Sequence, residues 1–473
     1  MLIYPPGKLY QRGEDRAQCN IEDSTAGSIH ACNDLGYAAS ILRKEQYDIF
    51  LCDYQTEGKN IEDVKNDLIN FSPNLILIST TNATIYKDIS FIKEVKRICN
   101  CKIVLKGAIF YDIKSELLAH IDFSEIDCAI GGELEFIIAP LVNSLLKGNM
   151  LLSSVPGIIY FDETGFHKTS FDYNKNDLDS IPFPARDLMN NELYTRPDTG
   201  NPMATITVAR GCPSNCIFCL TPQITGKNVR LRSIDNIFSE IKECYYKYGI
   251  KDFFFKADTF TINKQWAISL CDKIISSELY QKISFTANSR ADTLSLELLS
   301  KMKEAGCFML AIGFESGNDE SLKMIKKGTT TQINLNAAKM VKSVGIPLFG
   351  FFIIGFPWEN KNTIEQTFSH ILDINPDFVE LHLAMPYFDT ELYTICEQSH
   401  ILSDDSLGFD TINPNTIGTS YVDLKDLLRM KRKFLIKFYT RPHYVLSKIT
   451  RNILSPAILF HYFKYGMKLF KHR

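Results

Sequence analysis

The chain has 473 residues, of which 45% are hydrophobic and 12% aromatic, so it can bury the cores of about two to four domains. Its formal net charge of −3 gives no overall attraction to nucleic acid, and no nucleic-acid partner is expected. The 13 cysteines are mostly scattered rather than arranged as a disulfide framework, which predicts a reducing, cytoplasmic location. No apolar run reaches the ~20 residues of a membrane-spanning helix, and residues 1–6 are too short for a signal peptide.

The first α/β region runs from about residue 35 to 148, where short apolar strands alternate with helical patterns. The expected strands are 49–52, 74–79, 101–105 and 126–130, and the expected helices are 63–71, 88–99 and 134–146. The run at 74–79 is almost continuously apolar, which is typical of a strand buried on both faces. The alternation predicts a doubly wound parallel sheet in a domain of residues 1–150.

Ligands of such sheets bind at the carboxyl ends of the strands, where a topological switch point opens a crevice. The predicted strand ends carry small or polar residues, namely Ser79, Thr80, Thr81, Gly107, Gly131, Gly132 and Glu133. Residues of this kind let a large ligand approach the backbone. No G-x-G-x-x-G motif follows a strand, which disfavours a dinucleotide. A purely structural α/β domain is the alternative interpretation.

Residues 151–200 lose this periodicity and read as a linker with one hairpin at 158–168, and the strand-helix rhythm returns from 201 to 395. The expected strands are 204–209, 252–256, 283–288, 308–314, 348–354 and 378–383, and the expected helices are 233–248, 265–277, 295–305, 334–344 and 363–374. Six β/α repeats predict a partial parallel barrel, whose chemistry belongs at the carboxyl ends of its strands.

Three cysteines follow the first of these strands with the spacing C-x3-C-x2-C, at Cys212, Cys216 and Cys219. Three thiolates can hold three corners of a four-iron cluster and leave one iron open to a small chelating molecule. A zinc site is the alternative, but zinc normally takes a fourth Cys or His, and no His lies within about twenty residues. A disulfide would leave one thiol over.

The other barrel strands also end in groups that can bind a ligand. In chain order these are Asp258, Asn288, Arg290, Glu315, Ser316, Gly355, Glu359, His382 and Tyr387. Each can be a satisfied structural residue, and a lone histidine such as His382 is more typical of a core. Six successive strand ends that converge on the cysteines nevertheless predict a binding site at the barrel mouth.

The region after the barrel, residues 396–473, is expected to be helical with a basic tail. From Lys431 to the end there are eleven Lys or Arg and no Asp or Glu, and aromatic residues are interleaved with them. Such a segment is typical of a membrane-surface or partner-docking element. A helical cap that packs on the barrel is the alternative.

These residues together resemble the class B radical S-adenosylmethionine (SAM) enzymes, which carry a cobalamin-binding domain before a radical SAM barrel. The resemblance covers about residues 30–395. It rests on the cysteine motif and on five further segments, 181–187, 257–261, 288–292, 313–317 and 355–357, with the sequences IPFPARD, ADTFT, NSRAD, GFESG and GFP.

The resemblance implies roles for particular residues. The three cysteines would ligate a [4Fe-4S] cluster whose open iron chelates SAM, and a flavodoxin or ferredoxin-type protein would supply electrons. Phe218, Ile353 and Gly355 would lie at the adenine. Asp258, Asn288, Arg290 and Glu315 would contact the methionyl and ribose groups. Cleavage of SAM would then yield a 5′-deoxyadenosyl radical that abstracts hydrogen from an unactivated carbon.

The resemblance also implies cobalamin at the strand ends of the first domain. No D-x-H-x-x-G motif is present, so cobalamin would bind without a histidine ligand, and the loop 106–110 (KGAIF) departs from the usual small Gly/Pro-rich loop. The implied reaction is methylation of a small-molecule or lipid-like substrate, with peripheral membrane contact through the tail. The alternatives are a non-methylating cyclase, oxidoreductase or C–C coupling enzyme, and an iron-sulfur redox sensor.

Overall fold

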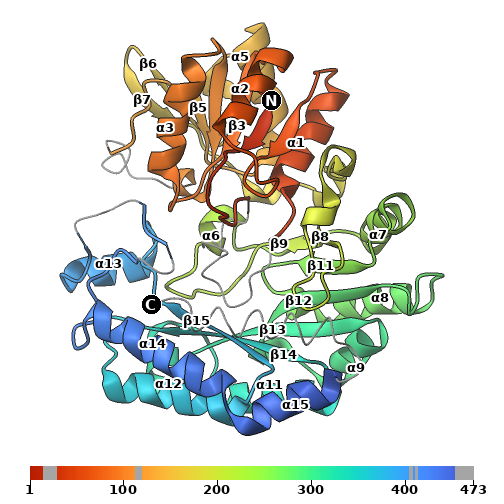
Figure 1. The fold of residues 1–473 in the computed structure, drawn as a ribbon, viewed down its shortest axis with the longest axis vertical. Helices are drawn as coiled ribbons and strands as arrows, with labels where there is room; N and C mark the ends of the chain where they lie inside the picture. The colour runs from red at the N-terminus through yellow and green to blue at the C-terminus, as the bar shows by residue number, and fades with distance from the viewer. Residues whose placement is uncertain (14–28, 112–119, 404–407, 411–413, 453–473) are drawn as a thin grey trace.

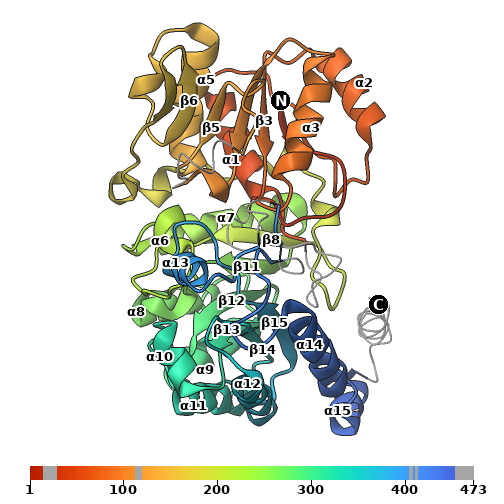
Figure 2. The same ribbon diagram turned by 90° about the vertical axis from the view of Figure 1, so that its left-hand side faces the viewer.

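The computed structural model describes residues 1–13, 29–111, 120–403, 408–410 and 414–452 and consists of two α/β units stacked along the long axis (Figures 1 and 2). The N-terminal unit lies above the C-terminal one, and the predicted α/β class is confirmed. No helix in the described ranges is long and apolar enough to cross a lipid bilayer.

The first unit is built on a seven-stranded sheet in the order β2-β1-β3-β4-β5-β6-β7. The parallel strands are β1 (Leu2–Tyr4), β2 (Leu51–Asp53), β3 (Leu75–Ser79), β4 (Lys102–Lys106) and β5 (Cys128–Ile130). The hairpin β6 (Ile158–Asp162) and β7 (Gly165–Lys168) continues the sheet antiparallel to β5. The sequence missed β1, which is short, and placed the hairpin in a linker, although its apolar residues complete this sheet.

Helices cover both faces of the first sheet, as the doubly wound prediction requires. Helices α1 (Asn33–Lys44) and α5 (Leu134–Lys147) pack on one face, and α2 (Ile61–Phe71) and α3 (Ile85–Lys96) pack on the other. Pro140 lies inside α5 without ending it. The strand order 2-1-3-4-5 places the topological switch point between β1 and β3.

The second unit is a six-stranded parallel sheet in the order β15-β14-β13-β12-β11-β8, with β8 and β15 at its edges. Its strands are β8 (Met203–Thr207), β11 (Asp252–Lys256), β12 (Ser284–Arg290), β13 (Cys307–Glu315), β14 (Leu348–Ile354) and β15 (Phe378–Leu383). The predicted partial barrel of six β/α repeats is therefore confirmed.

The main helices of this unit begin where the sequence supplies a capping side chain. They are α7 (Ile234–Tyr248), α8 (Lys264–Ile275), α9 (Leu296–Glu304), α11 (Thr331–Ser343) and α12 (Lys361–Ile374). Ser233, Asn263, Ser295, Thr330 and Asn360 each accept a hydrogen bond from a backbone N–H of the first turn. These caps explain why the predicted helix starts lie close to the observed ones.

The C-terminal region packs on the barrel through α14 (Leu424–Tyr439) and α15 (Pro442–Asn452), after the short α13 (Glu391–Gln398). Phe434 stacks on Phe368 of α12 with ring centroids 4.3 Å apart, and Phe438 is fully buried. The Tyr439 hydroxyl donates to the Val379 carbonyl oxygen of β15 at 3.0 Å and accepts from its N–H. The described part of the predicted basic tail is therefore a helical cap over an edge strand, and residues 453–473 lie outside the described ranges.

Candidate active site between the two units

The three cysteines lie in the loop that connects the two strands of a small antiparallel ribbon at the top of the barrel. The ribbon pairs β9 (Ala209–Arg210) with β10 (Arg230–Leu231), and the short α6 (Thr221–Ile224) follows Cys219. In Figure 1, α6 and β9 lie at the junction of the two units. Cys212, Cys216 and Cys219 are all partly exposed residues.

The base of this loop is tightly closed. The Cys212 N–H donates to the Gly226 carbonyl at 3.2 Å. Gly211 has φ +92°, and a Cβ there would lie 2.0 Å from the Asn228 carbonyl oxygen, so only glycine fits before Cys212. In the described ranges, no three Cys, His, Asp or Glu side chains converge to bind a single metal ion.

Asp258, at the end of β11, faces the cysteine loop. Its carboxylate accepts hydrogen bonds from the Gly211 N–H at 2.6 Å, the Thr221 hydroxyl at 3.2 Å and the Thr225 hydroxyl at 2.9 Å. Thr221 in turn contacts the Cys219 sulfur, with its hydroxyl at 3.2 Å and its N–H at 3.5 Å. The residue predicted to contact SAM thus ties both ends of the loop to the barrel.

A cluster of charges lies beside Cys216. The Arg290 Nη1 is 3.8 Å from the Cys216 sulfur, and its other nitrogens donate to Asp292 at 2.9 and 2.8 Å and to the Lys327 carbonyl at 2.5 Å. The buried Lys327 ammonium donates to Glu315 at 2.7 Å. Burial raises the pKa of Cys216, and the positive charges of Lys327 and Arg290 oppose that rise.

Arg290 and Glu315 therefore already have protein partners, whereas Asn288 is half-buried and its side chain makes no hydrogen bond with the described residues. Asn288 and Arg290 both lie on β12, on the same face of the strand because they are two residues apart. Sequence reasoning missed Lys327, which follows the helix α10 (Asp319–Met324) rather than a strand.

The opposite side of the mouth is apolar. Phe218 lies against Phe356 with ring centroids 6.1 Å apart, and Ile353 belongs to the same partly buried cluster. Gly355 has φ +91°, a conformation that favours glycine, and its N–H donates to the Glu359 carboxylate at 2.7 Å. Burial raises the pKa of Glu359 to about 7, although two backbone N–H groups favour its charged form.

A cleft lies between the cysteine loop and the carboxyl edge of the first sheet, with about 730 Å³ of empty space including open solvent. The first unit lines it with Asp34, Lys106, Tyr111, Glu133 and Glu135, and the second unit with Thr207, Arg210, Thr225, Lys256 and Asp258, among others. A smaller, mainly apolar cavity of about 390 Å³ shares Tyr111 and Ile224 and reaches Leu220 and Phe388. Both cavities border the loop that carries the cysteines.

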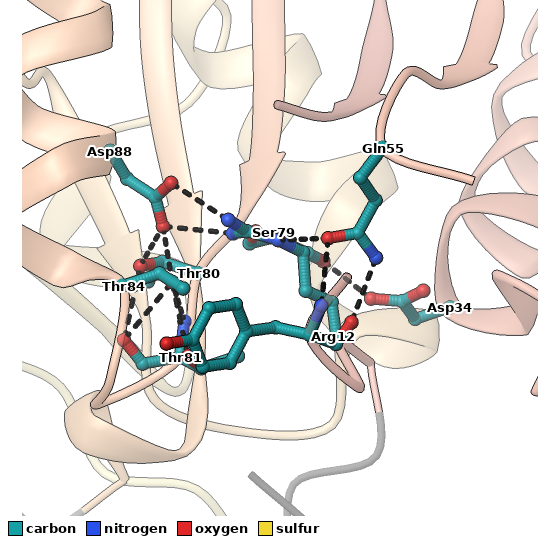
Figure 3. A network of polar contacts seen from close by, with 9 residues as sticks. Arg12, Asp34, Gln55, Ser79, Thr80, Thr81, Thr84 and Asp88 are labelled. Carbon is teal, nitrogen blue, oxygen red and sulfur yellow. Dashed lines mark hydrogen bonds and ion pairs between the residues drawn. The ribbon is translucent and has the colours of Figure 1, made fainter. Parts of the chain in front are cut away.

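The switch point of the first sheet is occupied by the protein's own polar side chains (Figure 3). Arg12 forms a two-pronged ion pair with Asp88 at 2.8 and 3.0 Å and donates to the Ser79 carbonyl at 2.7 Å. The Thr80 and Thr84 hydroxyls donate to the same carboxylate at 2.6 and 2.7 Å. These groups are buried and satisfied by one another, as buried charges must be.

Of the seven strand-end residues predicted for cobalamin, only Glu133 lines the cleft. The Ser79 hydroxyl donates to Asp34, and Thr80 and Thr81 belong to the network around Asp88. A Cβ on Gly107 would lie 2.7 Å from the Thr80 carbonyl oxygen, and one on Gly131 2.2 Å from that of Phe110.

The glycines thus allow the protein's own loops to approach one another, and Gly132 packs against Ile137 and Phe171 in the same way. Asp34 and Tyr111 line the cleft instead and were missed. Lys106, the first residue of the loop 106–110 in which the sequence departs from the usual pattern, lines the cleft as well.

Comparison with known proteins agrees with this architecture. The model of the radical SAM superfamily matches residues 206–371. An uncharacterized methyltransferase of Pyrococcus horikoshii is 30% identical over 416 residues, which cover 88% of this chain and 89% of the relative. An anaerobic magnesium-protoporphyrin IX monomethyl ester cyclase of Cereibacter sphaeroides is 25% identical, over 76% of this chain and 59% of its own length.

Among solved structures, the cobalamin-dependent SAM radical enzyme OxsB, with aqua-cobalamin and SAM bound, superposes with a TM-score of 0.72 at 18% identity. The match covers 98% of this chain and 71% of that chain. At this identity the likeness establishes the fold, including the order of the two units.

Proposed function

Because this chain belongs to the class B radical SAM enzymes, we propose that it cleaves SAM at a [4Fe-4S] cluster and methylates an unactivated carbon with the help of cobalamin. The observation that carries this proposal is the position of the cysteine loop. The three partly exposed thiols lie in a loop at the mouth of the barrel, and Ile224 and Thr225 of the same loop line a cleft that both units border. A reaction that needs two cofactors side by side fits such a junction.

Cys212, Cys216 and Cys219 would hold the cluster, and the Arg290 guanidinium beside Cys216 would offset the negative charge of the thiolates. When bound, the cofactors supply an electron for SAM cleavage and a methyl group for the substrate. The walls of the mouth suit SAM. Phe218, Ile353 and Gly355 would form the adenine side, and Asn288 is available to donate to a polar group.

Asp258, Arg290 and Glu315, which are predicted to contact SAM, also support the walls of the barrel mouth. Each already holds part of the mouth in place, through Gly211, Asp292 and Lys327 respectively. We propose that they contact SAM from positions that these bonds define. A bound carboxylate near Arg290 would share a guanidinium whose remaining partners keep it oriented.

The cleft also suits cobalamin. It is partly open to solvent and mixed in polarity, and in the described ranges no histidine lines it. We propose that Asp34, Lys106, Tyr111 and Glu133 face the corrinoid. The strand-end residues Ser79, Thr80, Thr81, Gly107, Gly131 and Gly132 would shape the floor beneath them through their mutual contacts.

The decisive experiment is anaerobic reconstitution with iron, sulfide and cobalamin, followed by SAM, a reductant and candidate substrates. We expect 5′-deoxyadenosine, S-adenosylhomocysteine and a methylated product by mass spectrometry. Replacing the three site cysteines with alanine should remove the cluster absorbance, whereas Cys99→Ala, at another partly exposed cysteine, should retain it. A substrate altered without an added methyl group would contradict methylation and favour a cyclase, an oxidoreductase or a C–C coupling enzyme.

A small-molecule substrate and an external electron donor follow from the same chemistry, and the apolar cavity next to Leu220 favours an uncharged, lipid-like portion of the substrate. Membrane contact through the tail is a separate proposal. It is supported by Val445, Leu446 and Ile449 on α15, which are 41%, 60% and 44% exposed. Because α14 belongs to the barrel core, the test is Leu446→Glu or deletion of 453–473 in a vesicle-binding assay, and unchanged binding would refute it.

A further inference from the structure

The ribbon at the base of the cysteine loop carries two positive charges that need counter-charges. Arg210 of β9 and Arg230 of β10 are cross-strand partners, and their side chains are only 14% and 11% exposed. Like charges directly opposite one another on paired strands are destabilising, and burial increases the repulsion. The ribbon therefore depends on anions from elsewhere in the chain.

Two glutamates of the first unit supply those anions. Glu133, which precedes α5, binds Arg230 through both oxygens at 2.6 and 2.9 Å and Arg210 at 3.1 Å. Glu135, in the first turn of α5, binds Arg210 at 2.5 and 3.2 Å. Burial acts to raise the pKa of Glu135, but the charge of Arg210 and its hydrogen bonds outweigh burial and lower it. The four groups form a buried, electrically neutral cluster between the two units.

The same arginines hold both ends of the cysteine loop. Arg210 directly precedes Gly211, whose N–H is bound by Asp258. Arg230 donates through Nη2 to the Thr225 carbonyl at 3.0 Å, where the loop leaves α6. The loop is thus anchored from below by a carboxylate of the barrel and from above by two carboxylates of the first unit.

We propose that Glu133 and Glu135 are positioning residues that clamp the cysteine loop, so that docking of the first unit sets the pose of the loop. The cofactors that the clamp would align rest on the proposed function, but the clamp itself is a property of this chain's own contacts. Bidentate Arg–carboxylate pairs suit this role because they define orientation as well as distance.

The test is amide hydrogen exchange on full-length, cluster-reconstituted protein carrying Glu133→Gln and Glu135→Gln. Glutamine keeps the shape and removes the charge, so we expect exchange in 209–212 and 225–231 to accelerate at least about tenfold. We also expect an altered electron paramagnetic resonance spectrum of the reduced cluster and more 5′-deoxyadenosine per methylated product. Unchanged exchange in both segments would overturn the proposal.

Asp187→Asn is the matched control. Asp187 and Arg43 of α1 form a 2.8 Å ion pair that also joins the first unit to the following chain, but both are exposed and neither contacts the ribbon. The Asp187→Asn variant should therefore leave amide exchange in the cysteine loop unchanged. If the double variant fails to fold, the same exchange measurement is made on Glu135→Gln alone. It is also made on the charge-swapped pair Glu135→Arg with Arg210→Glu, which should restore protection of the loop amides against exchange. If the wild type forms no methylated product, the proposed function fails, while the exchange data still decide the clamp.

Discussion

Replacing Asp258 with alanine tests whether this carboxylate supports the cysteine loop or contacts SAM alone. The substitution removes the acceptor of three hydrogen bonds, from Gly211, Thr221 and Thr225. Hydrogen bonds to a charged group contribute about 1.5–3 kcal/mol each. Asp258 is half-buried, so water replaces part of each bond and the lower figure applies, which gives about 4.5 kcal/mol for the three bonds.

A loss of about 4.5 kcal/mol would favour opening of the loop by a factor of roughly 10³. We therefore expect Asp258→Ala to bind much less iron after reconstitution, without SAM present, and to lose the electron paramagnetic resonance signal of the reduced cluster. Asp258→Asn keeps one acceptor oxygen and should retain an intermediate amount of iron. Thr225→Val, which removes one bond of about 1.5 kcal/mol, should have a smaller effect still.

The measurements are iron and sulfide content, the cluster spectrum and SAM binding on the same preparations. If Asp258→Ala holds as much iron as the wild type and loses only SAM affinity, the support role is wrong and a direct contact with SAM explains the residue. If both iron and SAM binding are unchanged, neither role stands.

Two further perturbations test the barrel around the site. Glu359 has a folded pKa of about 7 and an unfolded value near 4.5, so the folded state binds more protons between these pH values. The free energy of unfolding should therefore fall as pH rises from about 4.5 to 7, by up to about 3 kcal/mol, and Glu359→Gln should flatten that slope in urea titrations. An unchanged slope would contradict the burial argument. Phe434→Ala removes a buried ring that stacks on Phe368 and should cost about 3–5 kcal/mol by chemical denaturation, against a small effect for the exposed Leu446→Ala. A loss below about 1 kcal/mol would show that α14 is not part of the barrel core.

The regular elements of the second unit could be predicted because their signals are local. The strand 252–256 has three consecutive phenylalanines at its centre, and its observed bounds are identical to those expected. Ser233 predicts the start of α7 because its side chain caps the helix. Short elements could not be predicted in this way. β1 has three residues, and the β9–β10 ribbon has two per strand, so neither shows a period. β1 forms because it pairs with β2 and β3, and β9 and β10 form by pairing with each other.

The residues of the candidate site, too, could be predicted only where their signal is local. Spacing alone identified Cys212, Cys216 and Cys219, because the ligands of a cluster can lie within one short loop. Lys327 could not be predicted from the sequence, because its place in the site depends on its buried ion pair with Glu315 inside the barrel. Ser79 and Thr80 were expected to face a ligand, but their hydroxyls donate to Asp34 and Asp88.

The sequence by itself determined the chemistry of this protein, since a run of eight residues holds three thiols and the flanking apolar periods specify parallel sheets. Only the tertiary structure decided what holds that run in place. Arg210 of the ribbon binds Glu135 of the first unit across 75 residues of chain. Helix and strand periods arise between neighbouring residues, whereas an ion pair between two units depends on how complete sheets dock, and no local pattern records that.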